Sequence, residues 1–292
     1  MERTTHLKNY KINLRYAFCV MRSTLCVMLT QAIILNQKPF KEHDVKITVY
    51  TIDQGKLELI ARGVKKIKSK LAGHLEPICL SNIMIVYGRY FDYIGSAISK
   101  NCYLNIKNNL DKIYCARQAL NLVDQLTKQN EGSGAEIVFD LLQSFLDILD
   151  IHEKNEVKCT KKTKLGLKPK QDNHKLLFHF FTLTLLSVLG YQPELYNCVI
   201  CKNKITLNNN WFDLLKGGLI CSKCSTLSNG AKNITPNNAM PLKISNDCIK
   251  VLRLGVDSNF KELIKLKINE KLILETTQII FNFQLTIFNS PC

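Results

Sequence analysis

Two Cys-x-x-Cys pairs carry the most specific chemistry in the sequence. Cys198 and Cys201 form the first pair, Cys221 and Cys224 form the second, and nineteen residues separate them. Two thiolates three positions apart can bind one ion, and this separation leaves room for a hairpin that brings the pairs together. Four thiolates complete a tetrahedron and leave no position open for water. We therefore expect one structural Zn²⁺ per chain.

The four cysteines allow two other interpretations. They could be unrelated buried thiols, although chance rarely produces both spacings at this distance. One pair could be a thiol–disulfide redox site, but neither pair lies between a strand and a helix of a βαβ unit. The metal site is therefore the favoured interpretation.

A cationic loop, residues 62–70, is the second group of candidate residues. It holds one arginine and four lysines and no acidic residue. Such a loop beside a barrel strand can follow a phosphate backbone, and two lysines expected between the first two strands would extend its surface. The same lysines could instead form only a solvated surface. The predicted DNA-binding residues are Lys38, Lys41, Arg62, Lys65, Lys66, Lys68 and Lys70.

Aromatic residues and histidines offer less specific signals. Tyr50, Tyr87, Tyr90 and Phe91 could stack on bases, but filling a core is the simpler interpretation. His179 lies in an apolar segment and is expected to be a hydrogen-bonded core residue, not a base. The sequence contains no phosphate-binding loop, no His-Glu-x-x-His and no Gly-x-Ser-x-Gly motif. We therefore predict no catalytic residues and no enzymatic activity.

Composition limits the classes of protein to which the chain can belong. With 292 residues and 46% hydrophobic residues, it can form two domains with hydrophobic cores. Its formal charge of +16 attracts polyanions, nucleic acid first and an anionic membrane surface second. The eight cysteines outside the two pairs are scattered, which indicates a reducing compartment and predicts a cytoplasmic protein.

The N-terminal segment needs separate treatment. Residues 16–35 are mostly apolar and follow basic residues, as in a signal peptide or membrane anchor. However, Arg22 interrupts this run, and no small-residue cleavage site follows it. We therefore treat residues 1–27 as an extension outside the fold, with Met28 as an alternative start, and expect no membrane partner.

The remaining sequence predicts an α+β protein. Hydrophobic alternation from Thr30 to about Ile98 predicts five short strands and an N-terminal OB-fold β-barrel, residues 28–106. Helical periodicity then predicts an all-helical domain, residues 107–292, with the four-cysteine zinc module 195–227 inserted. A lysine-rich linker is expected at 152–173. The expected helices are 110–126, 137–149, 175–189, 245–255 and 259–287.

This order of features resembles the RecO family of bacterial DNA repair and recombination mediators. The resemblance rests on the segments 32–44, 50–56, 61–63, 189–195, 198–201 and 217–221, and it covers about residues 30–290. It implies an OB-fold, a helical domain with a zinc module, binding to single- and double-stranded DNA, and annealing of complementary strands. It also implies RecR, single-stranded DNA-binding protein and, through loading, RecA as partners near the nucleoid.

Two features depart from the family pattern: the extension before Met28 and the long lysine-rich linker after Asp150. Two other functions also remain as alternatives. A zinc-ribbon regulator that binds nucleic acid would use the same cysteines, and a zinc- or thiol-dependent nucleic-acid enzyme would need an open metal position or a nearby base.

Overall fold

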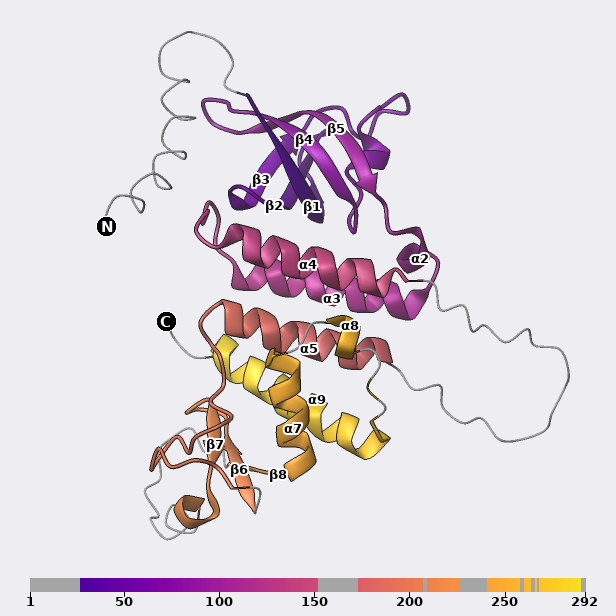
Figure 1. Ribbon diagram of the computed structural model, residues 1–292. Helices are drawn as coiled ribbons and strands as arrows, with labels where there is room; N and C mark the ends of the chain where they lie inside the picture. Colours follow the sequence, from indigo (N-terminus) through magenta and orange to yellow (C-terminus); the bar gives the residue numbers. More distant parts are fainter. Residues whose placement is uncertain are drawn as a thin grey trace, which may run out of the picture. The chain divides into compact units, whose positions relative to one another are not determined.

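The structure, a computed structural model, describes residues 27–151, 173–206, 209–225, 241–257, 260–263, 266 and 268–289. The expected extension 1–27, apart from Val27, and the expected linker 152–173, apart from Asn173, lie outside these ranges. The chain divides into two compact units (Figure 1). Unit 1 comprises Met1–Cys102 and Thr127–Ala135, and unit 2 comprises Tyr103–Leu126 and Glu136–Cys292.

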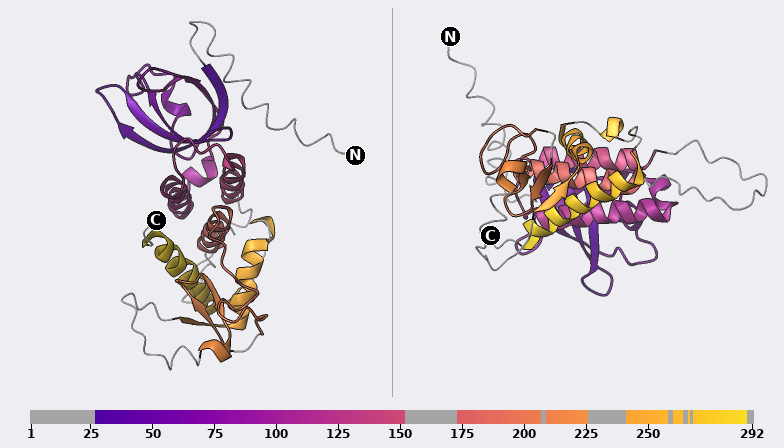
Figure 2. Two further views of the ribbon diagram at one scale, coloured as in Figure 1. Left: turned by 90° about the vertical axis from the view of Figure 1, so that its left-hand side faces the viewer. Right: turned by 90° about the horizontal axis from the view of Figure 1, so that it is seen from below.

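Unit 1 is a closed five-stranded barrel with the strand order β1-β2-β3-β5-β4 (Figure 2). Alternating side chains enter its core, among them Ile34 from β1, Ile47 from β2 and Leu59 from β3, which confirms the predicted OB-like sheet. A register shift after Ile34 interrupts the pairing of β1 with β2. The strands are β1 Val27–Pro39, β2 Val45–Thr51, β3 Gly55–Ala61, β4 Leu80–Val86 and β5 Tyr93–Asn101, and a short helix, η1, spans Ala72–His74.

The first strand is longer at both ends than the sequence predicts. It begins at Val27 and not at Thr30, because Val27 and the two residues after it pair with the end of β4. It continues to Pro39, so Lys38 lies in the strand, opposite Lys46, and not in the following loop. The expected position of Lys38 was therefore wrong, whereas Lys41 does lie in the loop between β1 and β2.

A segment far along the chain, residues 127–135, returns to contact the start of β3 in the barrel. The Asn130 N–H donates to the Lys56 carbonyl at 3.1 Å. Gly55 has a φ of +71°, and a Cβ there would lie 2.8 Å from the Glu131 carbonyl oxygen, so glycine permits this approach. Tyr50 is 3% exposed, and its burial, followed by the nearby Glu131 charge, raises its pKa to about 12. Tyr50 therefore cannot stack on a base.

Helices form most of unit 2, and apolar α5 lies among α3, α7, α8 and α9. Buried side chains such as Phe180, Phe181 and Leu186 cover several sides of α5, as its sequence predicts. The helix expected at 259–287 is instead two helices, because Asn269 caps the second by accepting the Leu272 N–H at 2.8 Å. The helices are α2 Leu104–Lys107, α3 Leu110–Leu126, α4 Ala135–Leu149, α5 Asn173–Val188, α7 Asn246–Asp257, α8 Phe260–Leu263 and α9 Glu270–Asn289.

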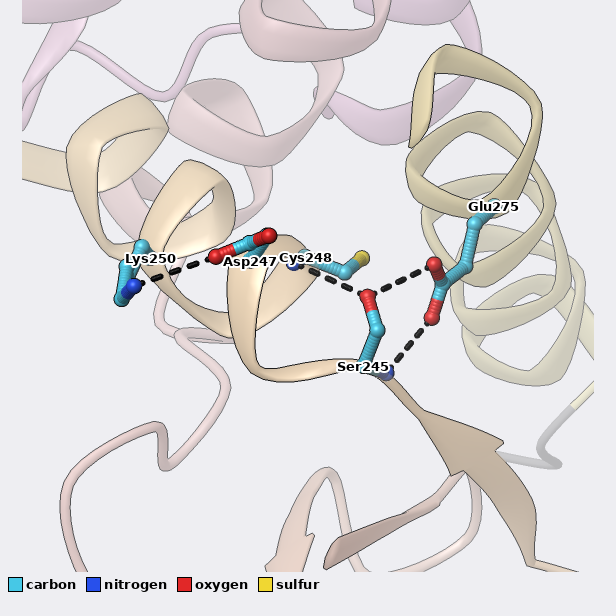
Figure 3. A network of polar contacts seen from close by, with 5 residues as sticks. All are labelled: Ser245, Asp247, Cys248, Lys250 and Glu275. Carbon is cyan, nitrogen blue, oxygen red and sulfur yellow. Dashed lines mark hydrogen bonds and ion pairs between the residues drawn. The ribbon is translucent and has the colours of Figure 1, made fainter. Parts of the chain in front are cut away.

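The start of α7 is bound to α9 by a capping network (Figure 3). The Ser245 Oγ accepts the Cys248 N–H at 3.2 Å, as an N-cap residue does. The Ser245 N–H and hydroxyl donate to the two carboxylate oxygens of Glu275 on α9, at 2.6 and 2.7 Å. A surface ion pair 3.1 Å long joins Lys250 to Asp247, which lies in the first turn of α7. The network fixes the direction in which the chain enters α7.

Unit 2 also contains a three-stranded sheet of order β7-β6-β8. The first two of these strands form the hairpin expected within the zinc module, whereas β8 belongs to a part predicted to be all-helical. The strands are β6 Asn210–Asp213, β7 Gly218–Ile220 and β8 Leu242–Ile244. The third strand, β8, lies outside the predicted 195–227 module. It joins the sheet by pairing with β6, where Asn210 lies opposite Ile244 and Phe212 lies opposite Leu242. None of the helices described here is both long and apolar enough to cross a membrane.

Candidate metal centre and nucleic-acid interface

Two tight turns present the four cysteines. In the first, the Lys202 N–H donates to the Cys198 carbonyl at 2.9 Å, and the Cys198 N–H donates to the Asn203 carbonyl at 2.8 Å. Lys202 has a φ of +60°, which closes the turn sharply. Cys221 directly follows β7, and Cys224 lies in the single helical turn at 222–225. The turns meet because the Val199 N–H donates to the Leu219 carbonyl of β7 at 2.9 Å.

The sulfur positions fit a zinc ion. The four Sγ atoms lie within 4.8 Å of one another, and those of Cys201 and Cys221 are 3.8 Å apart. A tetrahedral site with zinc–sulfur bonds of about 2.3 Å separates its sulfurs by about 3.8 Å. This donor set holds four soft ligands and no carboxylate, which suits a structural zinc.

Local electrostatics favour one thiolate and oppose further ones. Burial alone would raise the pKa of Cys198, but N–H donors from Cys201, Cys221 and Ile200 outweigh it and lower this pKa to about 6. In contrast, the hydrogen bond with Cys221, followed by burial, raises the pKa of Cys224 to about 12. Four converging thiolates therefore require a cation to offset their mutual repulsion.

The cysteines belong to a larger hydrophobic core. Cys198 and Cys224 lie in the same buried cluster as Leu186 of α5, Leu252 of α7 and Phe283 of α9. The ring centroids of Phe212, on β6, and Phe283 are 5.7 Å apart, in an edge-to-face contact. The module is thus continuous with the core of unit 2, and a bound metal would stabilise more than its own hairpin.

The cationic loop in unit 1 is anchored to the barrel and to the β1–β2 loop. Val64 is buried in the barrel core. The Gly63 N–H donates to the Asp44 Oδ1 at 2.9 Å, and the Lys65 N–H donates to the His43 carbonyl at 3.1 Å. The basic side chains of this loop stay exposed: Arg62, Lys65, Lys66, Lys68 and Lys70.

The other two predicted DNA-binding lysines lie in different surroundings. Lys41 lines a pocket with Arg62 at the base of the cationic loop. Lys38 is exposed on β1, near the ion pair that Lys46 makes with Glu58 at 2.5 Å. The hydrogen bond from Lys46 is the main cause of the lowered pKa of Glu58, to which the charge of Lys38 adds a smaller part. The charge of Lys38 thus acts weakly on this carboxylate, whose ion pair is with Lys46.

Comparison with known proteins places these features in a family. The family model described as recombination protein O N terminal matches residues 25–103, and the one described as recombination protein O C terminal matches residues 165–283. A DNA repair protein RecO from Dehalococcoides mccartyi (strain CBDB1) is 30% identical over 246 residues, which cover 84% of this chain and 85% of that protein. The chain belongs to the RecO family.

Other RecO proteins are similar over comparable lengths. The DNA repair protein RecO of Desulforamulus reducens is 27% identical over 252 residues, or 86% of each chain. That of Clostridium perfringens (strain 13 / Type A) is 27% identical over 234 residues, or 80% of this chain and 87% of the relative. The N-terminal RecO match spans the barrel, and the C-terminal match includes all four cysteines.

Two sets of residues in this RecO-family chain differ from the sequence-based expectation. Tyr90 and Phe91 are exposed in the loop before β5 and do not fill the core. They line the pocket together with Phe40 and Arg89, which sequence reasoning missed. The available signal was the adjacency of aromatic and basic residues in loops, as in Phe40-Lys41 and Arg89-Tyr90.

His179 was also predicted wrongly. Its Nδ1 is buried without a hydrogen-bond partner within the described part of the chain, so it is not a satisfied core residue. Burial lowers the pKa of His179 to about 4, which keeps the ring neutral near pH 7. The side chain lies on α5 beside Phe178, with ring centroids 5.5 Å apart.

Proposed function

We propose that this protein is a non-enzymatic mediator of recombinational DNA repair. It binds single- and double-stranded DNA, anneals complementary strands and helps to load a recombinase. The observation that carries the proposal is the anchored cationic surface of the barrel, in a chain whose relatives are DNA repair proteins. The proposed DNA-binding residues are Lys38, Lys41, Arg62, Lys65, Lys66, Lys68 and Lys70, on residues 28–106.

Charge neutralisation supplies the mechanism. Each lysine or arginine that contacts a phosphate releases condensed counterions, which drives binding without reading the sequence. Two strands whose phosphates are neutralised on one surface repel each other less, so complementary bases can meet and pair. Neither step consumes a nucleotide, which agrees with the absence of a phosphate-binding loop motif from the sequence.

The proposed zinc has a structural role in residues 107–292. Cys198, Cys201, Cys221 and Cys224 would hold it and so fix the cysteine turns in the core shared with α5, α7 and α9. With four protein ligands, the ion has no position for substrate or water. Family membership supports RecR, single-stranded DNA-binding protein and, indirectly, RecA as partners, in the cytoplasm near the nucleoid.

Equilibrium binding tests the proposal. Full-length protein is titrated into labelled single strands and duplexes of several sequences, at several salt concentrations. We expect binding to both forms, little dependence on sequence and affinity that falls as salt rises. Failure to bind either form at low salt, in folded protein, would refute the proposal.

A further inference from the structure

Three loops meet at one side of the barrel and enclose a pocket of about 500 Å³, within the range of about 300–1,000 Å³ common for ligand sites. The Phe40 N–H donates to the Asp44 carbonyl at 3.2 Å and closes the β1–β2 loop. Asp44 in turn accepts the Gly63 N–H of the cationic loop. The third loop, between β4 and β5, is held by the Ile60 N–H, which donates to the Asp92 carbonyl at 2.9 Å. The pocket is therefore built from hydrogen-bonded loops.

The β4–β5 loop exposes two aromatic rings. Tyr90 is 80% exposed and Phe91 is 51% exposed. A Cβ on Gly88 would lie 2.2 Å from the Phe91 carbonyl oxygen, so only glycine permits this tight loop. The Phe91 ring also contacts Phe40 edge-to-face, with centroids 5.7 Å apart. The backbone thus holds these aromatic faces at the surface, where they are open to a ligand.

Each part of this aromatic surface has a cation beside it. The Arg62 guanidinium carbon lies 4.0 Å from the centroid of the Tyr93 ring. The Arg89 guanidinium carbon lies 5.5 Å from the centroid of the Tyr90 ring. The Lys41 Nζ lies 5.7 Å from the centroid of the Phe40 ring. A ligand that suits the pocket therefore has flat apolar faces and negative charge close together.

We propose that this pocket takes one unpaired base of single-stranded DNA, stacked against Tyr90 and Phe91. Arg62, Arg89 and Lys41 would hold the adjoining phosphates. Phosphates alone would need only the cations, whereas base faces are the chemistry that exposed aromatic rings recognise. In a duplex, neighbouring base pairs cover those faces. The pocket therefore favours single strands, whereas the cationic loop binds either form; this inference rests on the proposed DNA binding.

An oligonucleotide that lacks bases separates the two contributions. Full-length protein is titrated into a labelled single strand and into a strand of equal length built from abasic nucleotides, which has the same phosphates. We expect the intact strand to bind about 5- to 150-fold more tightly than the abasic strand. This ratio corresponds to the free energy of one base stacked on an aromatic ring, about 1–3 kcal/mol. Tyr90→Ala/Phe91→Ala protein should bind both strands equally, with the salt dependence of wild type.

Two control variants test the assignment to these rings. Tyr90→Phe keeps the aromatic face and should retain the preference for the intact strand. Ile98→Ala removes an exposed apolar side chain from β5, outside the pocket, and should also retain it. Equal affinity of wild type for both strands, or an unchanged preference in the folded double variant, would overturn the inference. Absence of binding to either strand would refute both it and the proposed function.

Discussion

Reversing the charge of Lys65, Lys66 and Lys68 to Glu isolates the electrostatic part of DNA binding. If the five cations of the cationic loop each contact a phosphate of a single strand, they contribute about −3.5 to the slope of log affinity against log salt, at about −0.7 each. Removal of three contacts should leave about −1.4 from this loop. The three side chains are exposed, and backbone hydrogen bonds within the loop do not depend on them, so the barrel should stay folded.

Fluorescence anisotropy of a labelled single strand, measured over a series of salt concentrations, gives this slope. A matched control reverses Lys216, Lys243 and Lys271, which are exposed in unit 2 and change the net charge equally. The control should lose less affinity and keep most of the slope. If the loop variant is folded but keeps the affinity and slope of wild type, its lysines are only a solvated surface. The linker lysines at 161, 162 and 164 would then be tested next.

Three further predictions concern the metal, a buried histidine and the first strand. Metal analysis of protein prepared without chelator should find one zinc per chain, and substoichiometric zinc in the wild type would contradict the site. The variants Cys198→Ser and Cys221→Ser should lose the zinc and lower the thermal stability of unit 2. They should change the salt dependence of DNA affinity little. Burial lowers the pKa of His179 from 6.5 to about 4, so between these pH values the unfolded chain binds a proton that the folded chain does not. The free energy of unfolding should therefore fall as the pH drops through this range, by about 3 kcal/mol at most. The variant His179→Leu should lose this pH dependence, and a variant with the same dependence of stability on pH as wild type would argue against burial of the ring. A chain that starts at Met28 loses only the pairing of Val27 with Val86 from β1, so its melting temperature and DNA affinity should match those of the full chain; insolubility would contradict this.

Features that depend on local sequence were predictable. Alternation in segments such as 45–51 predicts strands because successive side chains point to opposite faces, and the structure closes them into a barrel. The cysteine spacing predicted convergence of Cys198, Cys201, Cys221 and Cys224, because two turns and a hairpin suffice to bring them together.

Features that depend on distant segments were not predictable from local patterns. A core position was the simpler interpretation of Tyr50, but the sequence did not indicate that the segment 127–135 contacts β3, about 75 residues earlier in the chain. Strand β8 completes a sheet with residues some 30 positions before it. The pocket around Phe40 and Tyr90 forms only because the barrel brings three loops together. Side-chain types in those loops indicate chemistry, but their convergence requires the fold.

Annealing in the absence of nucleotide tests the central proposal most directly. Two complementary oligonucleotides, one carrying a fluorophore and the other a quencher, are mixed with and without full-length protein, and the rate of quenching is followed. The proposed mediator function predicts faster annealing with wild type and no acceleration by the Lys65→Glu/Lys66→Glu/Lys68→Glu variant. Annealing at the protein-free rate with folded, DNA-binding wild type would contradict the proposal.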